Sequence, residues 1–400
     1  MPDSLITLAG RLITNGIRFR CLRASGKVQK PSAVSIEVTH QCIARCIMCN
    51  IWRIPRDTPS LSAQDWLALL SRDLFSDLVE LDITGGEPFL RKDLSDLLTS
   101  VCELKKSRLA SLRSIAVTTN GFLTRRVLEE SRKILFEARC ADVDLVMVCA
   151  MDAVGDVHDG VRNVPGGWRR VDQTIQGLKR LRAEFSNLII GLKTTVLPIT
   201  VGQLDAIVRY AKKNDLFTII SPCIITRGRY LNPDRAEDLA FTPEQVQEMT
   251  RFFQKQASRW SFHEECLVRY FQTGQMKKAC SCGFNYFFIR SHGALFPCPM
   301  IDASPGNVAE TPVETLLASD AAVRIRRQAG RFPECRHCTE PGLERYSLPC
   351  EGWTYLSLLP KMGRKRFLHM HHHMGLDKYF TQGAACFHNS SKPERREDSY

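Results

Sequence analysis

The chain has 400 residues, of which 44% are apolar and 24% are charged, a balance typical of a globular protein with a large buried core. This composition excludes a largely disordered chain, and no apolar run approaches the roughly 20 residues that a membrane-spanning helix needs. The net charge of +12 is spread along helical segments with acidic residues interleaved, which argues against a nucleic-acid-binding protein.

The sixteen cysteines set the expected compartment. In a small secreted chain they would indicate disulfides, but the first residues lack the apolar run and the cleavage site of a signal peptide. We therefore expect a cytoplasmic protein whose thiols stay reduced and bind metal.

The first segment, residues 1–32, is basic and carries apolar residues at near-helical spacing. Residues 1–30 contain six Lys or Arg and one Asp. A peripheral membrane helix and a helix packed on the main domain both fit this pattern, and the modest amphipathicity favours the packed helix.

Residues 33–226 alternate short apolar, β-branched runs with segments of helical period, which is typical of parallel β/α units. The six runs are AVSIEV, LVELDIT, LRSIAVTT, DVDLVMVCA, NLIIGLKTTV and FTIISPCII. Helix start signals such as Ser62 with Asp65 lie between them. Six consecutive right-handed units predict an α/β protein with a partial (β/α)6 TIM-like barrel rather than a complete eightfold barrel.

The chain changes character after the predicted barrel. Residues 227–270 are expected to form a loop and connecting helices. Residues 271–360 contain six cysteines, short aromatic strands and many turn residues, which predicts a small cysteine-rich α+β domain stabilised by metal. Residues 361–400 lose periodicity, are basic and include the run His369 to His373, so we expect a disordered tail.

The stretch THQCIARCIMCNIW places Cys42, Cys46 and Cys49 directly after the first predicted strand. In barrel folds the loops that follow the strands form the active-site face. An iron-sulfur cubane usually takes four thiolates, so three close thiolates leave one iron open to a small molecule.

A second motif, LDITGGEPFLR, follows the second predicted strand on the same face. Gly85 and Gly86 let the backbone approach a ligand closely, and Glu87, before Pro88, offers an anionic acceptor for an ammonium group. A tight turn from strand to helix would account for the same residues without any ligand.

Together the two motifs resemble the radical S-adenosylmethionine (radical SAM) family, with Met48 as the hydrophobic residue before the last cysteine. The resemblance implies that the open iron of a [4Fe-4S] cluster binds the amino and carboxylate groups of the cofactor's methionine part. It also implies that an electron from the cluster cleaves the cofactor to a 5'-deoxyadenosyl radical, which abstracts hydrogen from a substrate.

The same resemblance implies two further cofactor contacts. Asn120 ends the third predicted strand, and Arg162 follows a His-Asp pair at the position that contacts the cofactor carboxylate in relatives. An ion pair in a surface loop is the alternative role of Arg162. Many relatives carry a serine where this chain has Ala150, so the serine contact is lost.

The cysteine-rich segment resembles the SPASM and twitch extensions of this family. The resemblance implies one auxiliary [4Fe-4S] cluster held by Cys280, Cys298, Cys335 and Cys338, with Cys282, Cys350 or Cys386 as substitute ligands. Spacing alone favours a structural zinc ribbon at the same four cysteines.

The sequence therefore predicts a radical SAM oxidoreductase that acts on a small-molecule or peptide substrate and receives electrons from a donor such as flavodoxin or ferredoxin. A maturase of ribosomal peptides or proteins is one alternative, and a non-catalytic zinc-binding interaction protein is another. The residues reveal neither the substrate, the oligomeric state nor the role of the histidine run.

Overall fold

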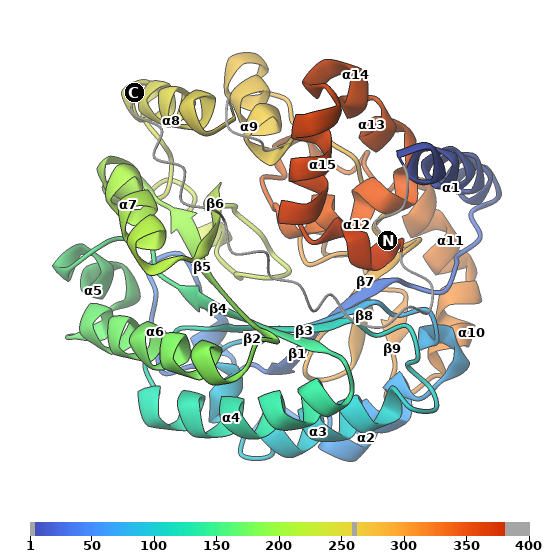
Figure 1. Cartoon of the computed structure of the whole chain (residues 1–400), viewed down its shortest axis with the longest axis horizontal. Coiled ribbons are helices and arrows are strands. Elements are labelled where there is room, and N and C mark those ends of the chain that lie inside the picture. Colours follow the sequence, from blue (N-terminus) through green and yellow to red (C-terminus); the bar gives the residue numbers. More distant parts are fainter. Residues whose placement is uncertain (1–4, 258–261, 381–400) are drawn as a thin grey trace.

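The structure, a computed structural model, describes residues 5–257 and 262–380 (Figure 1). Its centre is a nine-stranded sheet in the order β6-β5-β4-β3-β2-β1-β7-β8-β9. The first six strands are parallel neighbours in chain order. Their bounds are β1 Ala33–Thr39, β2 Glu80–Gly85, β3 Ser114–Thr119, β4 Asp144–Ala150, β5 Leu188–Val196 and β6 Phe217–Pro222.

Helices cover the outer face of these six strands, as Figure 1 shows. They are α2 Ala63–Leu70, α3 Leu94–Leu104, α4 Thr124–Cys140, α5 Asp156–Arg162, α6 Gly167–Glu184 and α7 Leu204–Asn214. The predicted start of α2 is a capping box, because the Asp65 amide donates to the Ser62 hydroxyl and the Ser62 amide donates to the Asp65 carboxylate. The predicted partial (β/α)6 barrel is confirmed.

The cysteine-rich segment does not form a separate sheet. Strand β7, Tyr286–Ile289, pairs in parallel with β1, and β8 (Ala294–Phe296) and β9 (Gly306–Asn307) continue antiparallel from it. All four residues of β7 are buried, and the strand supplies partners to an edge of β1 that would otherwise stay unpaired. Helices α10 (Val313–Ala318) and α11 (Asp320–Arg327) follow.

The last described helices lie on the open side of the barrel, between β6 and β7 in Figure 1. They are α12 Gly342–Glu351, α13 Trp353–Leu356, α14 Leu358–Met362 and α15 Arg364–His373, and α8 (Pro243–Ala257) and α9 (Phe262–Thr273) precede them in the chain. The predicted disorder from residue 361 is wrong as far as residue 380, because Phe367, Met370 and Leu376 are buried in the core. Cys386 lies outside the described residues.

The basic segment at the start of the chain forms helix α1, Leu5–Ser25, which packs on α12 and α13 as the sequence predicts. Two glycines allow this contact. A Cβ at Gly16 would lie 2.3 Å from the Trp353 ring nitrogen, and a Cβ at Gly352 would lie 2.1 Å from the Leu12 carbonyl oxygen.

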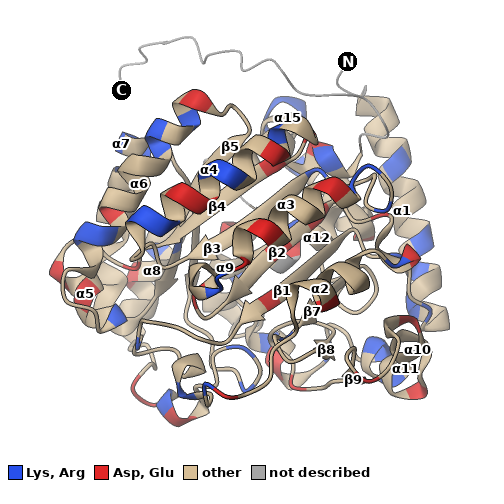
Figure 2. Ribbon diagram, turned by 90° about the horizontal axis from the view of Figure 1, so that it is seen from below, with Lys and Arg blue, Asp and Glu red and all other residues tan. Residues whose placement is uncertain are grey.

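Charge is distributed differently over the outer helices. In Figure 2, acidic and basic residues alternate along α3, α4 and α6, whereas basic residues recur along α1. None of the helices in the described ranges is long and apolar enough to cross a membrane.

Candidate active site

The candidate site lies where the parallel strands end. Thr39 of β1 is in register with Gly85 of β2, and Thr119 of β3 with Cys149 of β4. The cysteine loop, the glycine segment, Asn120 and Asp152 follow these four strands in turn, so all four motifs meet at one edge of the sheet.

The cysteine loop is held by backbone contacts on two sides. The amides of Arg45 and Ile47 donate to the carbonyls of Arg162 and Val161 at the end of α5, over 3.2 and 3.0 Å. The Met48 carbonyl accepts from the Asn232 amide nitrogen at 2.9 Å, and the Met48 side chain packs in the core. These contacts fix the loop without using any of its thiols.

The three thiols of the loop are shielded from water to different extents. Cys46 is buried, and Cys42 and Cys49 are half-buried. Burial raises the pKa of Cys42 and of Cys49 to about 12, and it also raises the pKa of Cys46. Metal binding at these thiols must therefore displace protons.

The glycine segment packs directly against the start of the cysteine loop. The amides of Gly86 and Glu87 donate to the carbonyls of Thr39 and Gln41, both over 2.8 Å. A Cβ at Gly86 would lie 2.1 Å from the Gln41 oxygen, and Gly85 has a φ of +137°. The close approach of two loops thus requires both glycines, and the buried Pro88 then begins a short 3-10 helix, Pro88–Leu90.

Glu87 is fully buried and joins the β2 turn to the end of β3. Its Oε1 accepts from the Thr119 hydroxyl at 2.8 Å and from the Phe89 amide at 3.1 Å, and its Oε2 accepts from the Asn120 amide at 2.7 Å. Burial raises the pKa of Glu87 to about 7, although these hydrogen bonds act in the opposite direction. Its contact with a cofactor ammonium group stays a prediction.

Asn120 carries an unused donor at this edge. Its Oδ1 accepts from the Phe122 amide at 2.9 Å, while its buried Nδ2 has no hydrogen-bond partner within the described part of the chain. A buried donor without a partner costs stability, so this atom fits a site that receives a polar ligand.

Arg162 is brought to the cysteine loop by a buried ion pair. Its Nε lies 2.6 Å from Oδ2 of the fully buried Asp152, and its Nη1 donates to the Cys46 sulfur over 3.6 Å. Burial opposes the charge of Arg162, but Asp152 and Cys46 outweigh it and raise the pKa of the guanidinium. The ion pair expected in a surface loop is instead interior.

Asp152 was missed as a site residue. Its Oδ1 also accepts from the Thr195 amide at 2.9 Å, so it links β4, β5 and α5. The available signal was a carboxylate directly after the apolar run of β4.

A second cysteine cluster lies beside β7 and β8. The five thiols that line this cavity of about 270 Å³ belong to Cys280, Cys282, Cys298, Cys335 and Cys338. We call it the five-cysteine cavity. Cys350 lies elsewhere, where it packs on Phe19 and Phe284 and accepts from the Gln29 side chain at 3.5 Å. Of the described substitute ligands, only Cys282 lines the cavity.

The shape of the five-cysteine cavity bears on the kind of metal group that it could hold. Across the described residues, no three His, Cys, Asp or Glu side chains converge closely enough to hold a single ion. The five thiols instead surround a space far larger than one ion, which suits a multinuclear iron-sulfur group. In the histidine run, His371 and His372 both contact Asp377, at 3.1 and 2.9 Å.

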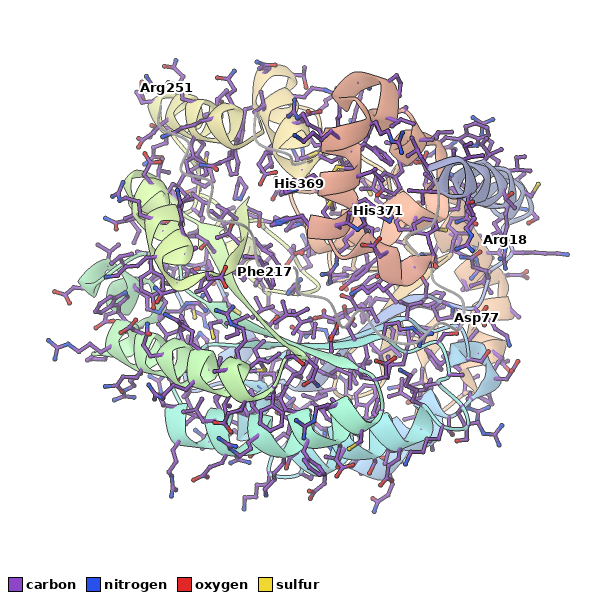
Figure 3. The ribbon with its side chains drawn as sticks, in the orientation of Figure 1. Arg18, Asp77, Phe217, Arg251, His369 and His371 are labelled. Carbon is purple, nitrogen blue, oxygen red and sulfur yellow. The ribbon has the colours of Figure 1, made fainter. Side chains whose placement is uncertain are left out.

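A third space, which we call the lumen cavity, lies inside the barrel and measures about 230 Å³. Phe217, in the middle of Figure 3, is among the residues that line it. Glu340 reaches this cavity from the segment after Cys338, and its oxygens lie 3.1 Å from Arg229 Nη1 and 3.7 Å from Lys193 Nζ. Burial opposes ionisation, but the two cations lower the pKa of Glu340 to about 2.

Asp82 of β2 also lines the lumen cavity and begins a short hydrogen-bond chain. Its Oδ2 accepts from the Ser35 hydroxyl at 2.6 Å, and the Ser35 oxygen accepts from the Tyr286 hydroxyl at 2.7 Å. Burial raises the pKa of Asp82. Polar residues that face inward on otherwise apolar strands were the missed signal for this network.

Comparison with known proteins agrees with this geometry. Residues 36–211 match the Radical SAM superfamily, and residues 280–339 match SPASM, an iron-sulfur cluster-binding domain. The chain belongs to the radical SAM superfamily. This radical SAM enzyme uses a [4Fe-4S] cluster with S-adenosylmethionine, and its SPASM domain adds auxiliary iron-sulfur chemistry.

Two curated relatives align over most of this radical SAM enzyme. The sporulation killing factor maturation protein SkfB of Bacillus subtilis is 21% identical over 79% of this chain and 72% of its own length. The AdoMet-dependent heme synthase of Methanosarcina barkeri is 22% identical over 74% of this chain and 85% of its own length.

Solved structures support the fold. Streptococcus suis SuiB bound to S-adenosylmethionine has a TM-score of 0.54 at 17% identity and aligns over 85% of this chain and 77% of its own. The enzyme anSMEcpe with bound AdoMet has a TM-score of 0.56 at 14% identity, over 88% of this chain and 96% of its own.

Proposed function

We propose that this radical SAM enzyme is a cytoplasmic oxidoreductase that oxidises a carbon centre of a peptide substrate held in the lumen cavity. The observation that carries this proposal is the thin wall between the two cavities. Cys298 and Cys338 line the five-cysteine cavity, while Pro299 and Glu340, one and two residues further along the chain, line the lumen cavity. An electron can cross so short a distance.

The residues of each site fit the groups that the family requires. We propose that Cys42, Cys46 and Cys49 hold the open cluster, and that the cofactor lies against Met48, Gly85, Gly86, Glu87, Pro88, Asn120 and Arg162. Cys280, Cys298, Cys335 and Cys338 would hold the closed cluster, with Cys282 as the substitute ligand. When bound, the first cluster with S-adenosylmethionine supplies hydrogen-atom abstraction, and the second supplies an electron acceptor.

The side chains around the cofactor have positioning roles in this proposal. Glu87 holds the Asn120 amide at 2.7 Å and so fixes the residue whose Nδ2 has no partner in the chain. Asp152 holds the guanidinium of Arg162 against the cysteine loop. Both carboxylates are fully buried, so neither position changes with solvent.

Oxidation of the substrate also releases a proton, because the substrate loses one hydrogen atom, one further electron and one proton. Asp82 lines the lumen cavity and is the carboxylate that we assign to accept this proton. Its bonds to Ser35 and, through it, to Tyr286 orient the carboxylate. A flavodoxin or ferredoxin would supply the electron that starts each turnover.

A peptide is favoured as substrate by the printed descriptions of several relatives. SkfB is a maturation protein, and AlbA of Bacillus subtilis is an antilisterial bacteriocin subtilosin biosynthesis protein. SuiB is described bound to the precursor peptide SuiA. A lumen cavity of about 230 Å³ suits one or two side chains of an extended peptide.

The test is anaerobic turnover of the purified enzyme with reductant, S-adenosylmethionine and a peptide extract of the source cells. We expect 5'-deoxyadenosine and peptides lighter by two hydrogen atoms, and neither should form with the Cys46→Ala variant. Modified peptides of unchanged oxidation state would refute the net oxidation, and absence of 5'-deoxyadenosine would refute cofactor cleavage.

A further inference from the structure

Helix α1 has one covered face and one uncovered apolar stripe. Leu8, Leu12, Gly16 and Phe19 face the protein and are buried. On the opposite face Ile6, Ile13 and Ile17 are 85%, 39% and 55% exposed. Packing on α12 and α13 therefore uses only half of the helix.

The exposed isoleucines form a continuous row with Gly10. Positions 6, 10, 13 and 17 are separated by four, three and four residues, the spacing that places side chains along one helix face. A Cβ at Gly10 would meet no atom within 4 Å. The row is thus open to solvent along its whole length.

The charge of α1 is of one sign. Its four charged residues are Arg11, Arg18, Arg20 and Arg23, and no acidic residue occurs between Leu5 and Ser25. Figure 3 places Arg18 on the outer rim of the molecule. The neighbouring helices add exposed Lys361, Arg364 and Lys365, since α13 packs on both α1 and α14.

We propose that α1 docks the enzyme on the surface of an anionic lipid membrane. The isoleucine row would enter the boundary between headgroups and acyl chains, and the arginines would contact lipid phosphates. A second copy of the chain is a poorer occupant, because a twofold contact through α1 would set the same four arginines against each other. This proposal does not depend on the substrate or the reaction proposed above.

The test is co-flotation of the cluster-loaded full-length enzyme with vesicles, followed by titration of lipid. We expect binding to vesicles of phosphatidylglycerol and phosphatidylcholine, weaker binding at high salt, and no binding to phosphatidylcholine alone. Ile17→Asp should weaken binding by at least roughly tenfold, and Arg18→Gln by roughly fivefold.

Two further variants make the result specific to the isoleucine row. Gly10→Leu adds apolar surface where nothing is in the way and should strengthen binding by about tenfold. Ile199→Asp, at an isoleucine that is 59% exposed on the short 3-10 helix Pro198–Gln203, should leave binding unchanged. Iron content and 5'-deoxyadenosine formation should be the same in all four variants, which shows that each is folded.

Equal binding to neutral and anionic vesicles, or unchanged binding of Ile17→Asp, would overturn the proposal. If the enzyme instead ignores vesicles, is a dimer by light scattering and becomes a monomer with Ile17→Asp, then α1 contacts a second copy and the membrane assignment is wrong.

Discussion

The two cysteine sites of this enzyme are built in opposite ways. Cys42, Cys46 and Cys49 lie within one loop, whose backbone is fixed by bonds to α5 and to the glycine segment. The five-cysteine cavity draws its thiols from three separate segments of the chain, around residues 280, 298 and 335. The first site is organised before any metal binds, whereas the second needs the metal to hold its segments together.

The surroundings of the two sites differ in the same sense. At the strand ends, the buried Asn120 Nδ2 is left without a partner and Arg162 faces a sulfur. In the five-cysteine cavity, Met276, Met300 and Ile301 share the wall with the thiols. One site therefore offers contacts to a ligand, and the other encloses its contents. The two should fail independently when mutated.

The largest expected effect comes from the cysteine loop. Replacing Cys42, Cys46 and Cys49 together with Ala should abolish 5'-deoxyadenosine formation, because no other thiols lie on that loop to hold an open cluster. The secondary structure measured by circular dichroism should stay at the wild-type level, since backbone bonds hold the loop. Residual cofactor cleavage by the triple variant would move the reaction out of the barrel.

The next effect is loss of the second cluster alone. Cys335→Ala with Cys338→Ala should lower iron by about four atoms per chain and keep cofactor cleavage. The melting temperature should fall, because metal binding supplies part of the folding free energy there. Unchanged iron with lost zinc would instead make this domain a structural zinc knot.

Glu80 tests how firmly the barrel holds the helices that follow the second site. This carboxylate is 1% exposed and contacts Arg345, Lys378 and the Tyr379 hydroxyl. Glu80→Gln should lower the free energy of unfolding by about 3 to 5 kcal/mol, because two buried cations lose their partner. The surface variant Glu184→Gln, which breaks a pair with Arg132, should leave unfolding unchanged.

The pH dependence of this effect has a definite sign. Burial alone would raise the pKa of Glu80, but Arg345 and Lys378 lower it to about 2. The folded pKa lies below the unfolded value, so the ion cluster stabilises the protein fully above about pH 4.5 and loses this contribution only as pH falls toward 2. Thermal unfolding at pH 5 and pH 7 should therefore show the same penalty for Glu80→Gln.

A smaller effect is expected at the edge of the cofactor site. Glu87→Gln should weaken S-adenosylmethionine binding by about tenfold, because it removes a charged acceptor from the Asn120 amide. Thr119→Val removes only one of the donors to Glu87 and should cost less. Isothermal titration with iron analysis checks both, and iron loss as the main effect of Glu87→Gln would make that residue a structural support of the cluster.

Local features of the sequence were sufficient for the barrel and the cysteine loop. Strand period and the spacing of three cysteines involve residues that are neighbours in the chain. The sequence could not reveal the pair between Asp152 and Arg162 or the contact of Glu340 with Lys193, because each joins segments distant in sequence. Helix α15 was missed for the same reason, since its apolar residues are buried only against other elements.

The most direct measurement is electron paramagnetic resonance of the reduced enzyme before and after S-adenosylmethionine is added. The account predicts two cluster signals, of which only one changes on addition. That signal should be absent from the Cys42, Cys46 and Cys49 triple variant and present in the Cys335 and Cys338 double variant. A change that persists in the triple variant, or one that affects both signals of the wild type, would contradict the assignment of one open and one closed cluster.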